Sequence, residues 1–374
     1  MLYRPFGKTG LSISALGFGA MRLPRKTESG KMVYDHEEGV KLLRQGFDLG
    51  INFVDSAPYY CDSESEIIVG KALRDGYRSK VSLSTKLPGD EAGYDKARKR
   101  LEQSLRNLQT DSIDFYHLWN ASWDRFAEEG IREQVRMALE AKEQGLIRHL
   151  SFSSHDSPEN IRKLIDTELF ETMLCQYNLL DCTNEEAIAY AAEKGLGVVV
   201  MGPVGGGRLG APSPRIQALL PEQIYSSPEI AMRFVLTNPH VCCALSGMGS
   251  SAMVEANAAV ASKGVPLTPE ERERVNRSIA ENRELEKLYC TGCNYCMPCP
   301  AGVNIPFIFR MMNYHRIYKI TEYSREQYAQ IGTIPWISGK KASACVECGQ
   351  CEDKCPQRLR IREQLRESAD ALEK

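Results

Sequence analysis

Eight of the thirteen cysteines of this 374-residue chain lie after residue 289, in two short runs. The first run contains Cys290, Cys293, Cys296 and Cys299 before Pro300, and the second contains Cys345, Cys348, Cys351 and Cys355 before Pro356. The second run has the spacing C-x2-C-x2-C-x3-C-P, in which three thiolates bind one [4Fe-4S] cluster and the fourth binds a neighbouring cluster. The tail is therefore predicted to fold around iron–sulfur clusters and to carry electrons.

The first cysteine run has one residue fewer before its last cysteine, and both runs end on a cysteine that precedes proline. The tail resembles a dicluster ferredoxin-like domain. That resemblance implies two [4Fe-4S] clusters, one held by Cys290, Cys293, Cys296 and Cys355 and the other by Cys345, Cys348, Cys351 and Cys299. The alternative is one cluster in the second run and zinc in the first, although zinc usually takes two separated C-x2-C pairs.

The composition excludes several classes of partner. The formal net charge is −2, so no basic field is available for nucleic acid or for an anionic membrane surface. No apolar run approaches the roughly 20 residues that span a bilayer, and residues 1–7 lack the shape of a signal peptide. We expect a cytoplasmic protein, in which clustered cysteines bind metal more often than they form disulfides.

Residues 1 to about 265 alternate short β-rich runs with amphipathic helical patterns. The eight β-rich runs are residues 15–19, 52–55, 81–86, 113–117, 148–152, 172–176, 197–201 and 241–246. Strands that alternate with helices predict right-handed β-α-β units and a parallel sheet. Eight units in about 250 residues favour a closed (β/α)8 TIM barrel. No G-x-G-x-x-G follows the first strand, which argues against a dinucleotide-binding Rossmann domain.

The fold class is therefore α/β, a (β/α)8 TIM barrel with a small, mostly α-helical iron–sulfur domain at its C-terminal side. The predicted domains are the barrel over residues 1–265, a connecting helix over 266–289 and the cluster domain over 290–374. Thr268-Pro269-Glu270-Glu271 predicts the start of the connecting helix. A hairpin over residues 3–14 is expected to cap the floor of the barrel.

Four polar residues close or follow successive predicted strands. Asp55 ends the second strand, Tyr60 follows five residues later, Lys86 ends the third strand and His117 ends the fourth. Polar residues at the carboxyl ends of barrel strands are the candidates for catalysis. A solvated strand end would explain any one of them alone, but four at three successive strands predict an active site.

The barrel resembles the aldo-keto reductases over about residues 1 to 260. The segments that carry the resemblance are Asn52-Phe53-Val54-Asp55-Ser56-Ala57 with Tyr60, Ser84-Thr85-Lys86, Tyr116-His117-Leu118, Gln176-Tyr177-Asn178-Leu179-Leu180 and the hairpin Gly7-x-Thr9-Gly10-Leu11. The resemblance implies that Tyr60 protonates a carbonyl oxygen as hydride arrives from a nicotinamide. Lys86 is expected to lower the pKa of Tyr60, Asp55 to hold Lys86, and His117 to polarise the carbonyl.

The same resemblance implies a set of cofactor contacts. They are Ser153, Ser154, Gln176, Met201, Gly205, Arg208, Gly247, Ser250 and Asn257. The family usually has Asn where this chain has Ser154 and often an aromatic residue where it has Met201. The basic residue that often binds the 2′-phosphate is missing between Gly247 and Asn257. NADP is therefore the expected cofactor, with NAD as the alternative.

These observations support two hypotheses of function. The first is an oxidoreductase that reduces a small-molecule carbonyl, or oxidises the alcohol, and whose clusters exchange electrons with a redox partner such as a ferredoxin or a flavoprotein. The second is a redox-sensing or electron-transfer protein whose barrel binds nicotinamide with little turnover. The departures at Ser154, at Met201 and at Ala256, where the family usually has a glutamate before the asparagine, motivate the second. The four polar residues at the strand ends motivate the first.

The cysteine assignment makes a direct prediction. Replacement Cys348→Ser removes one thiolate of the second run, so the variant is expected to lose about one cluster's worth of iron. Iron and acid-labile sulfide, measured per chain after anaerobic purification, check this expectation. An iron content equal to that of the wild type would refute the assignment.

Overall fold

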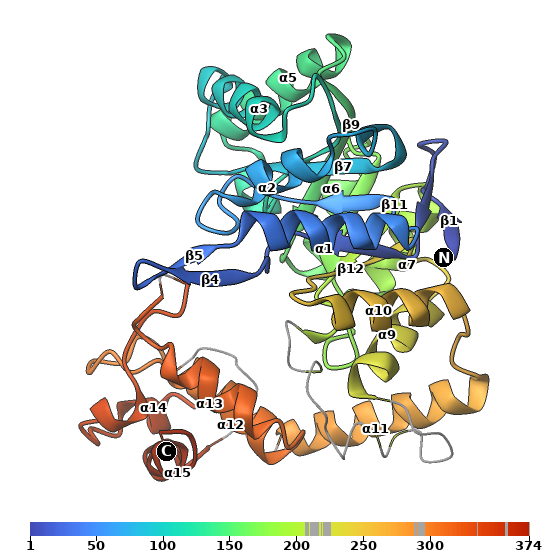
Figure 1. Cartoon of the computed structure of the whole chain (residues 1–374). Helices are drawn as coiled ribbons and strands as arrows, with labels where there is room; N and C mark the ends of the chain where they lie inside the picture. The colour runs from blue at the N-terminus through green and yellow to red at the C-terminus, as the bar shows by residue number, and fades with distance from the viewer. Residues whose placement is uncertain are drawn as a thin grey trace. The chain divides into compact units, whose positions relative to one another are not determined.

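A computed structural model describes residues 1–205, 209, 217, 219, 226–287, 290, 296–334, 336–355 and 358–373, without the side chains of 282–287. The chain divides into two compact units. The first contains Met1–Gly206 and Ala231–Leu267, and the second contains Gly207–Ile230 and Thr268–Lys374 (Figure 1). Each unit is described separately below.

Eight parallel strands of the first unit close into a barrel. They are β3 (Leu16–Gly19), β6 (Phe53–Asp55), β7 (Ser82–Leu87), β8 (Ile113–Leu118), β9 (Ile147–Ser154), β10 (Thr172–Gln176), β11 (Gly197–Met201) and β12 (Cys243–Ser246). Each strand pairs with the next in chain order, and β12 pairs with β3 to close the ring. The predicted barrel is thus confirmed, because all eight predicted strands are present in the expected order.

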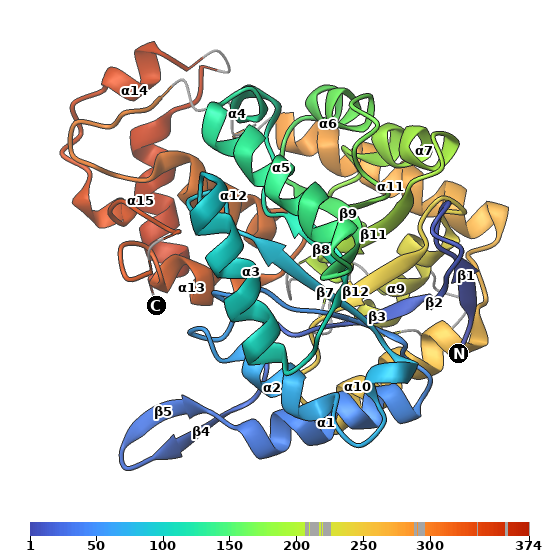
Figure 2. The ribbon, with the colours of Figure 1, turned by 90° about the horizontal axis from the view of Figure 1, so that it is seen from above.

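Helices follow the strands and surround the barrel (Figure 2). They are α1 (His36–Asp48), α2 (Ser65–Ala72), α3 (Tyr94–Leu108), α4 (Trp123–Phe126), α5 (Glu129–Glu143), α6 (Pro158–Ile165), α7 (Glu185–Glu193), α9 (Ser227–Thr237) and α10 (Ser251–Lys263). Local sequence explains several of their starts. The Asp35 carboxylate accepts hydrogen bonds from the Glu37 and Glu38 amides, and Ser157 caps α6 ahead of a proline at its first turn.

The predicted N-terminal hairpin closes the floor of the barrel. Strands β1 (Tyr3–Pro5) and β2 (Ser12–Ser14) pair antiparallel, and Phe6 between them is fully buried. The Phe6 ring packs edge-on against Phe115 and Phe53, with centroids 4.9 and 5.9 Å away. Gly7 passes so close to β11 that a Cβ there would lie 2.3 Å from the Gly197 amide nitrogen, and its φ of +56° also favours glycine.

A second hairpin, β4 (Arg25–Glu28) with β5 (Lys31–Tyr34), was not predicted from the sequence. Ser29 and Gly30 form its two-residue turn, and both have positive φ angles, as a type I′ turn requires. The Ser-Gly pair was the available signal. Its strands are exposed or half-buried, so they lack the alternation of buried and exposed residues that marks a strand in the sequence.

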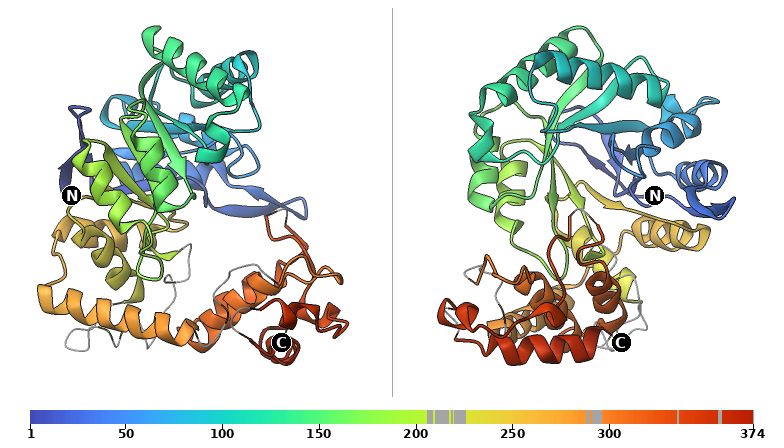
Figure 3. Two further views of the ribbon diagram at one scale, coloured as in Figure 1. Left: turned by 180° about the vertical axis from the view of Figure 1, so that it is seen from behind. Right: turned by 90° about the vertical axis from the view of Figure 1, so that its left-hand side faces the viewer.

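The second unit is helical, as predicted (Figure 3). Its helices are α11 (Pro269–Lys287), α12 (Ile305–Arg316), α13 (Thr321–Ala329), α14 (Gln350–Asp353) and α15 (Ile361–Leu372). At the predicted start of α11, the Glu271 carboxylate accepts from the Thr268 amide and the Thr268 hydroxyl accepts from the Glu271 amide, which completes a capping box. Within the described residues, no helix is both long enough and apolar enough to span a membrane.

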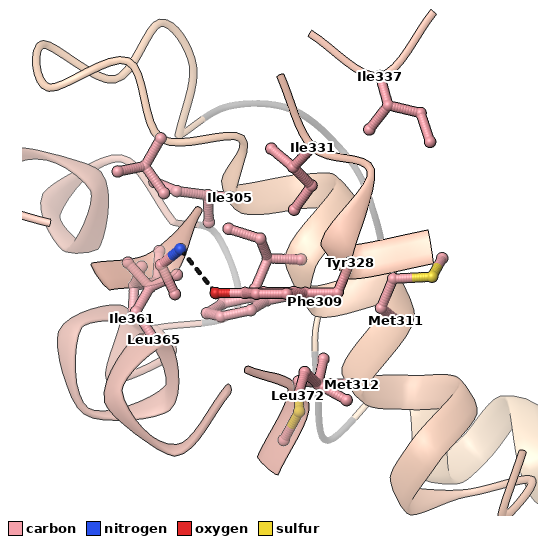
Figure 4. Close-up of a cluster of buried hydrophobic side chains, with 13 residues drawn as sticks. Ile305, Phe309, Met311, Met312, Tyr328, Ile331, Ile337, Ile361, Leu365 and Leu372 are labelled. Atoms are coloured by element: carbon pink, nitrogen blue, oxygen red, sulfur yellow. Dashed lines mark hydrogen bonds between the residues drawn. The ribbon is translucent and has the colours of Figure 1, made fainter. Parts of the chain in front are cut away.

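One hydrophobic cluster forms the core of the second unit (Figure 4). It joins residues of α12, α13 and α15 with the short segments between them, for example Phe309, Tyr328 and Leu365. The Tyr328 hydroxyl accepts a hydrogen bond of 2.9 Å from the Ala342 amide and donates one of 2.6 Å to Glu373. Six of the described cysteines of the two runs pack against this same core, so the core and the thiols form one folded unit.

The barrel floor gives a stability prediction. Replacement Phe6→Ala removes a fully buried ring that fills the space between two other aromatic side chains, so the free energy of unfolding of the first unit should fall by about 3–5 kcal/mol. Chemical denaturation followed by tryptophan fluorescence measures this change. The control Met32→Ala truncates a side chain that is 62% exposed and should change stability by less than about 0.5 kcal/mol. Equal effects of the two substitutions would contradict the packing described here.

Candidate active site

The four predicted catalytic residues come together at the carboxyl ends of three neighbouring strands. Asp55 ends β6, Lys86 is the penultimate residue of β7 and His117 is the penultimate residue of β8. The strand register places Lys86 directly beside His117. Tyr60 lies in the loop after β6, and its ring centroid is 4.7 Å from Lys86 Nζ. The structure therefore gathers Asp55, Tyr60 and His117 around the Lys86 side chain.

Asp55 and Lys86 form a buried ion pair. Lys86 Nζ donates to Asp55 Oδ2 at 2.5 Å and to the Ser56 carbonyl at 2.7 Å, and both charged side chains are 1–2% exposed. The Ser84 hydroxyl donates to the other carboxylate oxygen at 2.8 Å. Burial opposes the charged form of Lys86, but the Asp55 charge and hydrogen bonds outweigh it, so the pKa of Lys86 is raised. Ser84 and the Ser56 carbonyl complete this site, and the sequence did not reveal either role.

The environment of Tyr60 acts on its pKa in two directions. Burial raises the pKa of Tyr60, and the nearby Asp55 charge acts in the same direction. Lys86 lowers it, as expected, but does not outweigh the loss of solvent, so the net shift is upward. Lys86 therefore acts in the expected direction, but it does not decide the net shift. The sequence identified the neighbouring cation but could not show how far the phenol is withdrawn from water.

The chain directly after Tyr60 adopts an unusual backbone conformation. Cys61, Asp62 and Ser63 have φ angles of +56°, +53° and +72°, a left-handed conformation that non-glycine residues rarely adopt in succession. The turn is held by contacts on both sides, since the Cys61 thiol donates to the Ala20 carbonyl and the Tyr60 carbonyl accepts from the Ser63 and Ser65 amides. This strained turn fixes the backbone of Tyr60 at the start of α2.

His117 is buried and neutral. It is 1% exposed, and among the described residues neither ring nitrogen has a hydrogen-bond partner. Burial lowers the pKa of His117 to about 4; the Asp55 charge opposes this shift and the Lys86 charge adds to it. The Phe152 backbone favours protonation slightly without completing a hydrogen bond. A buried imidazole without partners is unusual in a folded protein, and it is suited to hydrogen-bond a bound ligand.

One tryptophan contacts the Tyr60 ring. Trp119, just after β8, lies edge-on to Tyr60 with ring centroids 5.5 Å apart, and it also contacts Tyr59 at 5.7 Å. Trp123 instead stacks on Phe126 within α4. Of these two tryptophans, Trp119 is the one placed next to the candidate acid.

The predicted nicotinamide contacts begin at the end of β9. Ser153 Oγ accepts a hydrogen bond from the Asn120 amide, so its O–H can donate to a ligand. Ser154 Oγ donates to the Ala121 carbonyl at 2.7 Å and accepts from the Asp156 amide at 3.1 Å. Ser154 therefore fixes the loop after β8 and retains one lone pair to accept from a ligand.

Gln176 and Met201 lie side by side at the ends of β10 and β11. The Gln176 amide rests against Gly202, where a Cβ would lie 2.9 Å from its Nε2 atom. Gly202 also has a φ of +63°, so the position requires glycine for two reasons. Met201 is half-buried, and the Gly205 amide donates to the Gly202 carbonyl. Arg208, the proposed phosphate partner, lies outside the described residues.

The end of β12 leads into a helix start that can accept an anion. Ser250 caps α10 by accepting from the Met253 amide, and the first turn of α10 contains no acidic residue. The Asn257 side chain donates to the Ser246 hydroxyl at 3.2 Å. Arg22, from the loop after β3, lies against Gly247: a Cβ there would be 3.4 Å from Arg22 Cβ. No motif indicates that Arg22 lies here, because the two loops meet only when the barrel closes.

Two of the described thiols from different cysteine runs lie near each other. Burial raises the pKa of Cys351, and the charges of Cys345 and Cys299 act in the same direction. Cys299 therefore lies within electrostatic reach of Cys351. The Glu347 amide also donates to the Cys345 sulfur at 3.4 Å. Cys293 lies outside the described residues, and within them no three His, Cys, Asp or Glu side chains are placed to hold a single metal ion.

Comparisons with known proteins agree with this architecture. The family model described as "Aldo/keto reductase family" matches residues 15–280, and the one described as "4Fe-4S dicluster domain" matches residues 289–359. L-galactose dehydrogenase from Arabidopsis thaliana is 28% identical over 287 residues, which cover 68% of this chain and 86% of that relative.

Two solved structures show the same fold. An aldo-keto reductase from Bacillus halodurans, in its holo form, is 30% identical with a TM-score of 0.63, covering 74% of this chain and 96% of that one. An aldo-keto reductase from Klebsiella pneumoniae, in complex with NADPH, is 25% identical with a TM-score of 0.62, covering 74% and 95%. The matches confirm the resemblance of the barrel and of the tail.

The buried imidazole predicts a pH dependence. An unfolded histidine titrates near 6.5, whereas the pKa of His117 in the fold is about 4. Between these values the unfolded chain binds a proton that the folded chain does not, so this contribution to stability is complete above pH 6.5 and is lost as the pH falls toward 4. From pH 7 to 4.5, the variant His117→Asn should therefore lose about 2–3 kcal/mol less stability than the wild type.

Nuclear magnetic resonance of histidines labelled with ¹⁵N in the ring gives the second test. The signal missing from His117→Asn identifies His117, which should remain neutral at pH 5.5. A ring that is already protonated at pH 6 would refute the buried, neutral state.

Proposed function

We propose that this chain, which belongs to the aldo/keto reductase family, uses its barrel to reduce the carbonyl group of a small molecule. The chain is an NAD(P)H-dependent oxidoreductase with a 4Fe-4S dicluster domain. The observation that carries the proposal is the buried Asp55–Lys86 pair, with the Lys86 ammonium beside the Tyr60 ring and with His117 unpartnered among the described residues. The reverse reaction, oxidation of an alcohol, follows from the same residues.

Each side chain has a separate task in this proposal. A bound reduced nicotinamide supplies the hydride to the carbonyl carbon. The Tyr60 hydroxyl gives its proton to the carbonyl oxygen, so the product is the alcohol and Tyr60 becomes a phenolate. The Lys86 ammonium stabilises that phenolate, and Asp55 keeps Lys86 charged and in place. Neutral His117 donates a hydrogen bond from a ring N–H to the carbonyl oxygen and thereby orients the substrate.

The residues at the ends of β9 to β12 fit a nicotinamide cofactor. The Gln176 amide against Gly202 and the Ser153 hydroxyl can bind the carboxamide, and Met201 offers an apolar contact to the ring. Gly205, Arg208, Gly247, Ser250 and Asn257 remain the proposed contacts for the phosphates and adenosine. Arg22 adds a positive charge beside Gly247. That charge supports NADP over NAD as the proposed cofactor, and the relative from Klebsiella pneumoniae holds NADPH.

We further propose two [4Fe-4S] clusters within residues 290–374. Cys299 lies within electrostatic reach of Cys351 although 52 positions separate them, which supports the exchange of the final cysteines between the runs. Six of the eight cysteines, from both runs, share one hydrophobic core. A nicotinamide transfers two electrons together and such a cluster accepts one, so the clusters are proposed to exchange electrons with a redox partner protein.

Replacement Tyr60→Phe tests the barrel chemistry. The variant keeps the ring that contacts Lys86 and Trp119 but loses the acidic hydroxyl, so carbonyl reduction should fall by about 10²–10⁴-fold. Binding of NADPH, measured by quenching of protein fluorescence, should remain unchanged. The activity is followed as NADPH oxidation with a panel of aldehydes and ketones.

The control is the neighbouring Tyr59→Phe, because the Tyr59 hydroxyl bonds to Asp90 and Glu91 and not to the site. Tyr59→Phe should keep wild-type activity within about threefold. A wild-type protein that binds NADPH but turns over no carbonyl, with Tyr60→Phe indistinguishable from it, would favour the second hypothesis of a nicotinamide-binding redox sensor.

A further inference from the structure

We infer that the surface around Cys348 is the docking site for an acidic one-electron carrier protein. This electron port consists of Val346 and Cys348 in the second cysteine run and of basic residues beside it in sequence, namely the exposed Lys340, Lys354 and Arg358 and the half-buried Lys341. The inference rests on the proposed function in one respect, namely that Cys345, Cys348, Cys351 and Cys299 bind a cluster.

Exposure identifies Cys348 as the edge of that cluster. Among the described cysteines, Cys348 is the one that is exposed, and all others are buried or half-buried. Val346, two residues earlier, is 69% exposed. Electrons enter or leave a protein most readily where the cluster comes closest to the surface. The Cys348 corner therefore offers the shortest path for an incoming electron.

The charges around this corner do not balance. Residues 340–366 contain seven Lys or Arg and four Asp or Glu, although the whole chain has a net charge of −2. Three of the four acids are paired within the segment, as Glu347–Arg366, Glu352–Arg362 and Glu363–Arg360. Outside these pairs the segment has one acidic residue, Asp353, and four basic residues, Lys340, Lys341, Lys354 and Arg358. The side chains therefore carry a local excess of positive charge in a chain that is acidic elsewhere, and a four-thiolate [4Fe-4S] cluster, with a net charge of about −2 when oxidised, would offset part of it.

The paired acids hold the port rigid. The Glu352 carboxylate accepts from the Arg362 amide at 2.9 Å and from the Arg362 guanidinium at 2.8 and 3.0 Å, which ties the loop of the second run to the first turn of α15. Arg366, one turn later, pairs with Glu347 between Val346 and Cys348. A loop that is fixed before binding loses little conformational freedom in a complex.

An exposed valine near basic residues in the sequence fits a small acidic redox protein. Val346 gives an apolar contact, and the basic residues of the segment steer a negatively charged partner toward the cluster. The reaction is the transfer of one electron from the reduced carrier to the oxidised cluster, with no bond broken and no proton moved. Weak electron-transfer complexes of this kind bury little surface, so the contact should be transient and dependent on salt.

The test is stopped-flow reduction of the clusters in the full-length, iron-replete protein by a reduced [2Fe-2S] ferredoxin of strongly acidic composition. The double variant Lys354→Glu/Arg358→Glu should lower the second-order rate constant about tenfold at low ionic strength, and the difference should vanish near 0.5 M salt. The matched control Lys99→Glu/Arg106→Glu makes the same charge change on exposed residues of α3. It should stay within about twofold of the wild type.

Val346→Glu gives an independent variant. It places a negative charge at the centre of the port and should slow the acidic ferredoxin, whereas Val265→Glu, at a valine that is 55% exposed in the first unit, should not. The cationic methyl viologen radical should reduce all port variants at least as fast as the wild type, which shows that the cluster remains intact and accessible.

A wild-type rate that is independent of salt, or equal slowing by the port and control variants, would overturn the docking site. Binding of the wild type to vesicles of anionic phospholipid, lost in the port variants while ferredoxin kinetics stay unchanged, would assign the surface to a membrane and would also overturn it. A wild-type protein that cannot be loaded with two clusters would instead refute the proposed pair of clusters, on which the port rests, and iron analysis distinguishes that failure from the others.

Discussion

The ion pair between Asp55 and Lys86 is the interaction on which the barrel chemistry depends. A buried ion pair contributes little net stability, because removing both charges from water offsets their attraction. Its value here is electrostatic, since it places one ammonium ion among groups that are otherwise neutral. Loss of either partner would leave the other charge buried without compensation, at about 3–5 kcal/mol. The pair therefore links the folding of β6 and β7 to the charge state of the active site.

Burial keeps two neighbours of this ammonium, Tyr60 and His117, uncharged. The pKa of Tyr60 is raised and that of His117 is lowered, so both groups are neutral at physiological pH. A phenol and a neutral imidazole can each donate a hydrogen bond to one carbonyl oxygen, which a phenolate could not do. The cation becomes most useful when Tyr60 has given up its proton, because attraction between opposite charges then replaces a cation–π contact. The site is thus arranged for the charge that develops during the reaction.

The sequence was sufficient for the fold because its signals are periodic and local. Eight apolar runs separated by helical patterns leave few topologies other than a closed barrel, and the four polar strand ends follow directly from that topology. The hairpin β4–β5 could not be predicted because neither of its strands has a buried face. The contacts of Arg22 and Ser84 could not be predicted for a different reason. Arg22 lies beside Gly247 and Ser84 bonds to Asp55, and these partners are distant in the sequence. The direction of the Tyr60 pKa shift required the extent of burial, which no motif specifies.

Ion pairs hold the reactive groups of both units, but they are buried in the first unit and exposed in the second. In the proposed reaction the barrel keeps a charge away from water until a hydride and a proton move, and its ion pair is buried at the strand ends. In the proposed electron transfer the cluster domain brings an electron to the surface at the exposed Cys348, and nearby arginines pair with Glu347 and Glu352. In each case the ion pairs hold a reactive group in place, while the remaining charge acts on the incoming substrate or partner. Burial makes the charge of Lys86 strong because water and salt screen it little, whereas exposure weakens the charge at the port and limits its range to about one Debye length.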